Sequence, residues 1–513
     1  MIRFSLKGLI GRLGSWVFSG WGRALLFCFV FGFVVRLIPE VLLSPYPIGF
    51  DPIWYVWRIR SGVVLFHWSQ FFSTWLLYGI LVPLYSATQV NLFGLLKVVA
   101  ALLFGFNACG MCYFATKGLG WSVKSGVFAG VFFSLQAAAL FISANLYRNM
   151  LGLGILLFTL PLIKDELRSK RQFLTLALLS MLVVWGHEVA SSILFAVVLG
   201  FLVVRFLGGQ KLDVKRRLIA VVPAFALFLV SFYFLVSPPM VQMDLNGIAL
   251  GEPSGNYQGA LYFFSNYLGV YETGQQFAAY SGLASQVFSC FGILYVLMLP
   301  LVLVGFFRDV VLDSWTVFTL VGSFGAVVMP FFAPSVWSRW MLMLVFPFTF
   351  YAVNGITKVF ELSGRDIGLN VKWLRGVNLR KTGLTLVVVI SLVSGLVFAV
   401  RAMPAQVSVV PFGDFADAER AVSWVNVQMG DDSVLLAHFA FNYWSRLCLD
   451  DGHARIYFKD DVDGALSLAT QRGFSDVYFV WWKEQVSWFN LVVPEGFSSV
   501  FSSGRICVLK YSK

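Results

Sequence analysis

Charged residues and cysteines are both scarce in this chain of 513 residues, and each shortage excludes a class of protein. Only 12% of the residues are charged, against about a quarter in soluble domains, whereas 58% are hydrophobic. An ordinary soluble fold is thereby excluded for most of the chain. The six cysteines are too few for a disulfide-stabilised scaffold. The long apolar runs that remain predict a polytopic membrane protein.

The net charge of +12 does not indicate nucleic acid as a partner, because of where the basic residues lie. They cluster in short segments between apolar runs, which is typical of topology signals and not of a phosphate-binding face. At the N-terminus, Arg3, Lys7 and Arg12 precede the first apolar run. No convincing small-x-small cleavage site follows, so we expect a retained membrane anchor instead of a cleaved signal peptide.

The apolar runs predict about eleven transmembrane helices, since a span needs roughly 20 mostly apolar residues. Residues 71–88 are also apolar, and we interpret them as a partly embedded piece of an external loop. The predicted spans lie near residues 24–42, 92–115, 122–143, 150–163, 172–186, 189–207, 217–237, 285–307, 314–333, 340–357 and 383–402.

The basic loops set the predicted orientation. With the N-terminus in the cytoplasm, every strongly basic loop becomes internal, which is the positive-inside pattern. Counting 71–88 as a span would invert the later loops. The transmembrane domain then covers 1–403 and exposes two long external loops, 43–91 and 238–284, while residues 404–513 form an external domain. The internal basic residues are Lys117, Lys124, Lys164, Arg168, Lys170, Arg171, Lys211, Lys215, Arg216, Arg217, Arg308 and Lys358, and others up to Lys381.

The C-terminal region predicts a small α/β domain, because its apolar runs shorten to strand length and alternate with helical segments. We expect helices over Asp414–Met429, with Asp414 as N-cap, and over Asn442–Leu449 and Asp461–Arg472. Strands are expected at Ser433–Ala437, Ala454–Phe458 and Asp476–Trp481, and a hairpin at Phe497–Tyr511. A disulfide between Cys448 and Cys507 stays open, because connectivity cannot be read from sequence.

The segment from Gly49 to Arg58, GFDPIWYVWR, carries the sharpest motif. Asp51 lies just after the first predicted span, and a carboxylate at the membrane face needs a partner or a task. A structural explanation is equally open, because Asp followed by Pro is a common helix start. The residues alone leave both explanations in place.

An aspartate in the first external loop is a mark of the GT-C superfamily of polyprenyl-phosphate-dependent glycosyltransferases, which this chain resembles. The segment around Asp51 looks like the first motif of the catalytic subunit of archaeal and bacterial oligosaccharyltransferases. The resemblance also covers the expected topology, the long external loop and the external α/β domain. It implies a GT-C-like membrane fold and a lipid-linked sugar donor. It also implies that Asp51 would bind Mg²⁺ or Mn²⁺ if the protein uses a metal.

This sequence differs from that family at two motifs, one involved in metal binding and one in acceptor binding. Where the family has an acidic pair, the turn Asn145–Asn149 contains no acid. Where the family has WWDYG, this chain has His438-Phe439-Ala440-Phe441-Asn442-Tyr443. The acidic pair helps to hold the metal in the family and WWDYG helps to bind a protein acceptor. The acceptor is therefore left open between protein, lipid and glycan, and metal use is uncertain on the residues alone.

Several further residues are candidates at the predicted outer ends of spans. Arg148 and Arg339 have guanidinium forks that match phosphate oxygens, although interfacial snorkelling would also explain them. The resemblance favours Arg339 for the lipid phosphate. His187 and Glu188 suit acid–base work, or form an ordinary surface pair. Further candidate substrate-binding residues are Arg58, Tyr147 and Glu272.

These observations predict a glycosyltransferase that uses a polyprenyl-phosphate-linked sugar on the external face of the cell membrane. Asp51, His187 and Glu188 are the predicted catalytic residues. The alternative is a lipid or polysaccharide transporter, which would favour ionisable groups at mid-membrane depth. Only Arg36 and Lys97 lie clearly within apolar runs. A structural scaffold is the third candidate.

Overall fold

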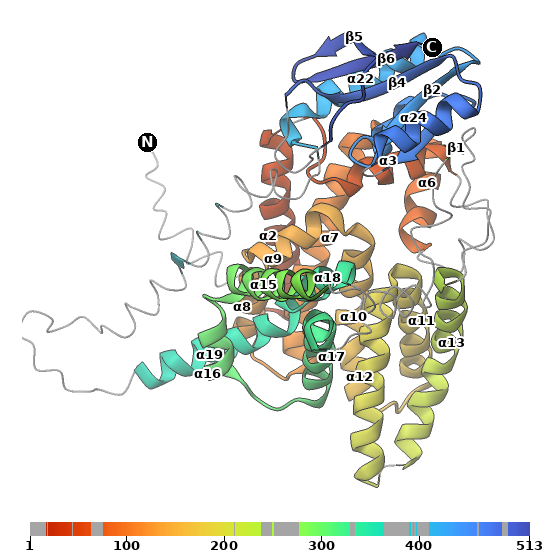
Figure 1. The fold of residues 1–513 in the computed structure, drawn as a ribbon. Helices are drawn as coiled ribbons and strands as arrows, with labels where there is room; N and C mark the ends of the chain where they lie inside the picture. The colour runs from red at the N-terminus through yellow and green to blue at the C-terminus, as the bar shows by residue number, and fades with distance from the viewer. Residues whose placement is uncertain are drawn as a thin grey trace, which may run out of the picture.

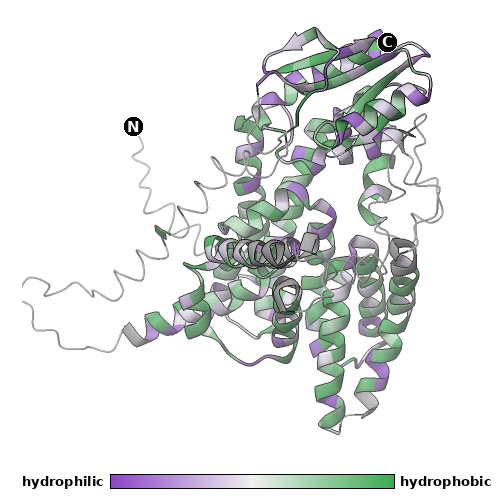
Figure 2. Ribbon diagram, viewed as in Figure 1, coloured by the Kyte–Doolittle hydropathy of each residue, from purple (hydrophilic) through white to green (hydrophobic). Residues whose placement is uncertain are grey.

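The computed structural model describes residues 17–43, 45–62, 75–209, 211–236, 249–250, 276–328, 334–363 and 410–512, apart from gaps at 18, 459–460 and 485–490, together with 389–390, 393 and 397. The fold is a bundle of apolar helices with a sheet domain at one end (Figure 1). Hydrophobic residues dominate the bundle, while the sheet domain mixes hydrophobic and hydrophilic positions (Figure 2). The predicted combination of a helical membrane domain and a C-terminal sheet domain is present.

The first described helices lead from the bundle to the sheet domain. Helix α2 (Trp21–Leu43) is 23 residues long and apolar, as a span requires. It is followed by two short helices, α3 (Asp51–Ser61) and α6 (Leu76–Thr88). With 13 residues, α6 is too short for a straight crossing of about 20 residues, in line with its interpretation as part of a loop.

The middle of the bundle is built from consecutive helices that run up and down. Helix α7 continues directly into the π-helix η1, and α8 and α9 meet at a bend of 62°. Glycines allow close packing here, since a Cβ added at Gly186 would lie 2.8 Å from Cα of Gly152. The elements are α7 (Leu92–Tyr113), η1 (Phe114–Gly118), α8 (Val123–Ser134), α9 (Ala137–Asn145), α10 (Tyr147–Lys164), α11 (Lys170–Gly186), α12 (Glu188–Leu207) and α13 (Lys211–Val236).

The remaining helices complete the bundle: α15 (Gln276–Tyr295), α16 (Leu299–Gly305), α17 (Val310–Val328), α18 (Pro334–Met343) and α19 (Val345–Ser363). By length and composition, four described helices could cross a membrane, or six if two bent pairs each count as one span. The expected count of about eleven is therefore not confirmed. Helix breaks account for part of the difference, and most of the predicted span 383–402 lies outside the described residues.

One end of the bundle gathers the basic loops, and we call it the basic end, comprising residues 117–124, 164–171, 205–217, 308 and 358. Contacts between distant loops define it. Lys164 pairs with Asp309, and Trp121 packs on Phe307 at 5.9 Å between ring centroids. Further contacts are Lys117 over the Trp21 ring, Arg217 to the carbonyl of Asp165 and Lys358 to the carbonyl of Phe306.

The sheet domain contains six strands in the order β1-β3-β2-β4-β6-β5. Strands β1, β3, β2 and β4 are parallel, and β6 and β5 follow antiparallel. The strands are β2 (Ser433–His438), β3 (Ala454–Phe458), β4 (Asp476–Trp482), β5 (Phe497–Ser503) and β6 (Ile506–Ser512). The edge strand β1 (Ala249–Leu250) lies in the sequence between α13 and α15, and no local sequence pattern predicted it.

The helices of this domain are α22 (Phe415–Gln428), α23 (Asn442–Cys448) and α24 (Val462–Gln471), with the 3-10 turn η5 (Phe412–Asp414) before them. Asp461 caps α24 by accepting the N–H of Gly464 at 2.7 Å. Asp414 occupies the predicted N-cap position of α22, but its side chain makes no cap hydrogen bond and accepts from Trp482 Nε1 at 2.9 Å instead. Cys448 and Cys507 are both free thiols, so no disulfide joins them in the structure.

The sheet domain rests on α3 at the end of the bundle opposite the basic end, and we call this the site end. Tyr46 donates a hydrogen bond to the carboxylate of Glu419 on α22. Arg60 donates to the carbonyl of Leu447 at 3.2 Å, and the guanidinium of Arg446 lies 4.9 Å from the ring centroid of Trp57. These contacts connect α3 and the segment before it to the sheet domain, which lies next to α3 in Figure 1.

Candidate functional site

Asp51 is the first residue of α3 and is half-buried. The helix begins with Pro52 in its first turn, as the sequence predicted. The interpretation of Asp51 as an N-cap is wrong, because Phe50 occupies the cap position and no side chain caps this helix. Helix capping therefore does not explain why an aspartate stands at position 51.

The backbone around Asp51 is held by the next turn of the bundle. The side-chain oxygen of Asn145, at the end of α9, accepts the N–H of Phe50 at 2.8 Å and that of Asp51 at 3.4 Å. Only a glycine fits at position 49 in this close packing of the two segments. Its φ is +124°, and a Cβ on this residue would lie 2.3 Å from the carbonyl oxygen of Ala144. The turn that lacks the expected acids thus uses an amide to position the aspartate.

A buried ion pair holds the same loop from the other side. The carboxylate of Glu40 accepts the N–H of Ile48 at 3.0 Å and lies 2.6 Å from the guanidinium of Arg36. Arg36 also donates to the hydroxyl of Ser143 at 2.8 Å, and Lys97 donates to the carbonyl of Glu40 at 2.8 Å. The two cations within apolar runs therefore both hold the segment that precedes Asp51.

Two arginines from other helices act on Asp51. Burial raises the pKa of Asp51 above its ordinary value, and the charges of Arg339 on α18 and Arg148 on α10 partly oppose that rise. Both arginine side chains are half-buried. Asp51, Arg148 and Arg339 were each predicted for separate reasons, and in the structure the charges of both arginines act on Asp51.

His187 and Glu188 join the same group where α11 ends and α12 begins. The Val189 N–H donates to Nδ1 of His187 at 3.1 Å, which assigns the ring proton to Nε2. This nitrogen lies 3.5 Å from a carboxylate oxygen of Glu188. Burial lowers the pKa of His187 to about 3, so the imidazole is neutral at physiological pH. The charges of Arg148 and Arg339 also act on both residues.

The second carboxylate oxygen of Glu188 is buried and accepts no hydrogen bond from any residue that the structure describes. A buried acceptor without a partner costs free energy unless a ligand or water supplies a donor. Glu188 and Arg339 are also the first residues of two candidate membrane spans. Two members of the group therefore lie at the ends of candidate spans.

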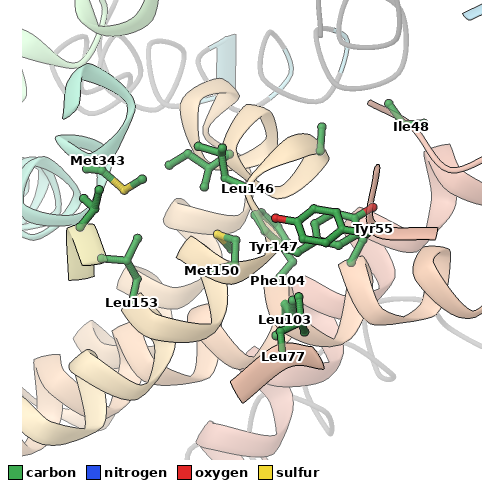
Figure 3. Packing of buried hydrophobic residues seen from close by; sticks show 14 of the residues in the cluster. Ile48, Tyr55, Leu77, Leu103, Phe104, Leu146, Tyr147, Met150, Leu153 and Met343 are labelled. Atoms are coloured by element: carbon green, nitrogen blue, oxygen red, sulfur yellow. The ribbon is translucent and has the colours of Figure 1, made fainter. Parts of the chain in front are cut away.

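Two stacked aromatic rings, those of Tyr55 and Tyr147, lie close enough to Asp51 for its charge to act on them (Figure 3 shows the two rings). The rings of Tyr55 and Tyr147 are parallel within 5°, with centroids 5.1 Å apart. Tyr55 shares a side-chain hydrogen bond with Arg148, and burial raises the pKa of Tyr55, so its phenol stays protonated. The hydroxyl of Tyr147 is buried and has no hydrogen-bond partner among the described residues.

Not every candidate joins the group. The Arg58 guanidinium packs over the rings of Tyr78 at 5.1 Å and Trp54 at 5.4 Å, about two turns of α3 further along the chain than Asp51. Glu272 lies outside the described residues. The sequence reasoning missed Asn145, Glu40 and Tyr55. Asn145 was overlooked because its turn was searched for acids, although an amide next to a predicted helix end was visible there.

The donor set at the site does not fit a divalent cation well. Among the described residues, no group of three or more His, Cys, Asp or Glu side chains could hold a metal. Mg²⁺ prefers carboxylate oxygens and water, but here both Arg148 and Arg339 act on Asp51 and on Glu188. Two positive charges at the same carboxylates oppose the binding of a third.

Comparisons with known proteins give similarities of fold only. No family model matches the chain, and no curated protein matches it in sequence. Among solved structures, the chain is similar to ArnT from Cupriavidus metallidurans bound to undecaprenyl phosphate, with 12% identity, a TM-score of 0.48 and coverage of 99% of this chain and 98% of that one. The apo structure of that ArnT also gives a TM-score of 0.48.

A second similar structure is the arabinofuranosyltransferase AftD from Mycobacteria. Its identity to this chain is 12% and its TM-score is 0.49. The similarity covers 96% of this chain but 40% of that one.

Proposed function

We propose that this multi-pass membrane protein is a GT-C-like glycosyltransferase that transfers a sugar from a polyprenyl-phosphate-linked donor to an acceptor on the external face. One observation carries the proposal: the charges of Arg148 and Arg339 both act on a positioned, half-buried Asp51, and Arg339 is the first residue of a candidate span. A carboxylate beside two guanidinium groups suits a reaction that removes a proton and releases a phosphate.

In the proposed reaction, Asp51 accepts the proton of an acceptor hydroxyl while the hydroxyl oxygen attacks the anomeric carbon of the donor. The bond from that carbon to the phosphate oxygen breaks, and the leaving lipid phosphate keeps the electron pair. Arg339 and Arg148 offset its growing negative charge. The raised pKa of Asp51 strengthens it as a base relative to an ordinary aspartate.

Glu188 and His187 have a supporting role in this proposal. The neutral imidazole orients the carboxylate through Nε2, and the remaining buried oxygen of Glu188 accepts a hydroxyl of the substrate. Tyr147, with its buried hydroxyl, is a candidate for another sugar contact. Substrate binding by Arg58 and Glu272 stays a prediction, as does the identity of the acceptor.

We further propose that the reaction needs no Mg²⁺ or Mn²⁺, because two guanidinium groups already supply the positive charge that a metal would provide. No step above involves a metal. The check is transfer after treatment with EDTA. Loss of transfer that Mn²⁺ restores would contradict metal independence.

The orientation is part of the proposal: N-terminus and basic end in the cytoplasm, and site end and sheet domain outside. The positive-inside rule supports it. Cysteines introduced at Arg168 and Lys215 should resist an impermeant thiol reagent in intact cells, whereas one at Ser499 on β5 should react. Native protein supplies the background of its own thiols. External labelling at 168 or 215 would reverse the orientation.

The transporter alternative has less support, because Arg36 and Lys97 both hold the segment that precedes Asp51. The Asp51→Asn variant separates the two functions. It keeps the side-chain shape and Pro52 but removes charge and basicity. General base catalysis is typically worth about 10²–10⁴-fold, so we expect a loss of sugar transfer of that order.

The control is Asp461→Asn, the same chemical change at a true helix cap in the sheet domain. Since Asn and Asp cap equally well, this variant should keep near-native transfer. Folded yield in detergent should match for both variants. A well-folded Asp51→Asn protein with near-native transfer would exclude Asp51 as the base and favour transport.

A further inference from the structure

The basic end contains a second place where two arginines converge, far from Asp51 along the bundle. Arg205 lies in the last turn of α12, and Arg217 lies in the second turn of α13. Both guanidinium carbons are 5.0 Å from the ring centroid of Phe201. The two helices form the antiparallel hairpin that extends furthest from the sheet domain (Figure 1).

Arg217 is fixed in place. It is 1% exposed, donates from Nε to the carbonyl of Ile163 at 2.7 Å and from Nη2 to the carbonyl of Asp165 at 2.6 Å. Arg205 is half-buried and its charge acts on Arg217. A buried cation beside a second cation is costly in a low-dielectric setting, so an anion at this place would stabilise the pair.

The neighbouring acidic groups only partly meet that need. Asp165 and Glu166, in the loop between α10 and α11, both act on Arg217. Glu166 is already in an ion pair with Arg168 at 2.7 Å, and both are exposed. Cations outnumber carboxylates among the described side chains around the hairpin, since Lys215 and Arg216 are exposed on the first turns of α13.

Next to this cluster lies an apolar surface that only acyl chains would cover in a membrane protein. It runs along the outer faces of α12 and α13 and includes Leu199, Val203, Phe206, Leu207, Leu218, Val222 and Phe225, each between 45% and 78% exposed. An anionic headgroup at the arginines would thus have its chains beside exposed hydrophobic side chains. Free phosphate would use the arginines alone.

We propose that the α12–α13 hairpin binds an anionic phospholipid, with the phosphate at the accessible guanidinium of Arg205, the charge of the buried Arg217 adding to the attraction, and the acyl chains on the outer faces of both helices. This site is independent of the proposed transferase site, because it lies at the opposite end of the bundle. Its lipid belongs to the other leaflet from the proposed donor. Its role is to anchor the hairpin.

The test is a thermal shift of the purified full chain in detergent with added phosphatidylglycerol, phosphatidylcholine or inorganic phosphate. Phosphatidylglycerol should raise the melting temperature, whereas the other two should not. In Arg205→Gln the apparent affinity for phosphatidylglycerol should fall roughly fivefold, the loss expected for one cation near an anionic surface. Arg205→Lys keeps the charge and should retain most of the binding.

The control is Arg308→Gln, which removes an exposed cation elsewhere at the basic end and should leave the lipid effect unchanged. A second variant, Leu207→Glu, places a negative charge on the apolar surface and should weaken the lipid effect without touching either arginine. Equal stabilisation by phosphatidylcholine, or by inorganic phosphate at the same concentration, would overturn the proposal. So would a native response in both Arg205→Gln and Leu207→Glu.

Discussion

Both ends of the bundle contain a pair of arginines, but the residues around the two pairs differ. Each end brings together two arginines, Arg148 with Arg339 at the site end and Arg205 with Arg217 at the basic end. At the site end the arginines act on half-buried carboxylates beneath a sheet domain. At the basic end they lie among carbonyl groups and exposed cations, next to exposed hydrophobic side chains of α12 and α13. An arginine pair therefore does not by itself distinguish the proposed transferase site; the carboxylates on which Arg148 and Arg339 act distinguish it.

The largest expected difference between the ends concerns ion pairs. Glu40→Gln leaves the Arg36 charge buried, since both side chains are 0% exposed. Breaking such a buried pair typically costs about 3–5 kcal/mol. Lys164→Ala removes the half-exposed pair with Asp309 at the basic end and should cost no more than about 1 kcal/mol. The apparent melting temperature in detergent measures both, and equal losses would contradict the comparison.

The second difference concerns catalysis. Arg339→Gln removes a charge that would offset the leaving phosphate, so transfer should fall about 10²–10³-fold. Arg205→Gln removes an arginine at the other end and should leave transfer within about twofold, because surface substitutions away from a site have small effects. Initial transfer rates in mixed micelles compare the two. A large loss of transfer in Arg205→Gln would show that the basic end contributes to catalysis.

The third difference concerns positioning by Asn145. Asn145→Ala removes the acceptor for the N–H groups of Phe50 and Asp51, and a displaced base can cost up to about 10²-fold. We expect kcat to fall more than the KM for the donor changes. Asn426→Ala is the matched control, because its amide accepts the N–H of Asp450 within the sheet domain. Unchanged kcat in a folded Asn145→Ala protein would argue against positioning.

The smallest expected effect is a displacement of the pH–rate profile. A base must be deprotonated, so transfer should fall as pH drops through the raised pKa of Asp51, at a pH above that of an ordinary aspartate. In Arg339→Gln the residual activity should need a still higher pH, since Arg339 is the main charge that lowers this pKa. His187, with a pKa of about 3, should add no step near neutral pH.

The sequence predicted the sheet domain more closely than the spans. The predicted strand Ala454–Phe458 matches β3 residue for residue, because a short apolar run between turn residues has few other solutions. The span predicted at 122–143 is instead two helices bent by 62° around Leu135–Gln136, where no Pro or Gly marks a break. At 285–307, Pro300 at the start of α16 did mark one.

The candidate site divides in the same way. Asp51, Arg148, Arg339 and the His187–Glu188 pair could be proposed one by one, because a polar group at the end of an apolar run is conspicuous. Their proximity depends on the tertiary structure and cannot be predicted from any single segment of the sequence. Asn145 was missed for the opposite reason, since a neutral amide at a helix end is unremarkable until its partner is known.

Strand β1 has a consequence for biosynthesis. Ala249 and Leu250 pair with Arg455 and Ile456 of β3, so the edge of the sheet is completed by a segment that the ribosome makes long before its partner. Domains usually fold as they emerge, beginning with the N-terminal parts. This sheet cannot be finished in that way. The sheet reaches its final form only after strands β2 to β6 have been synthesised, which ties the maturation of this domain to late steps of translation.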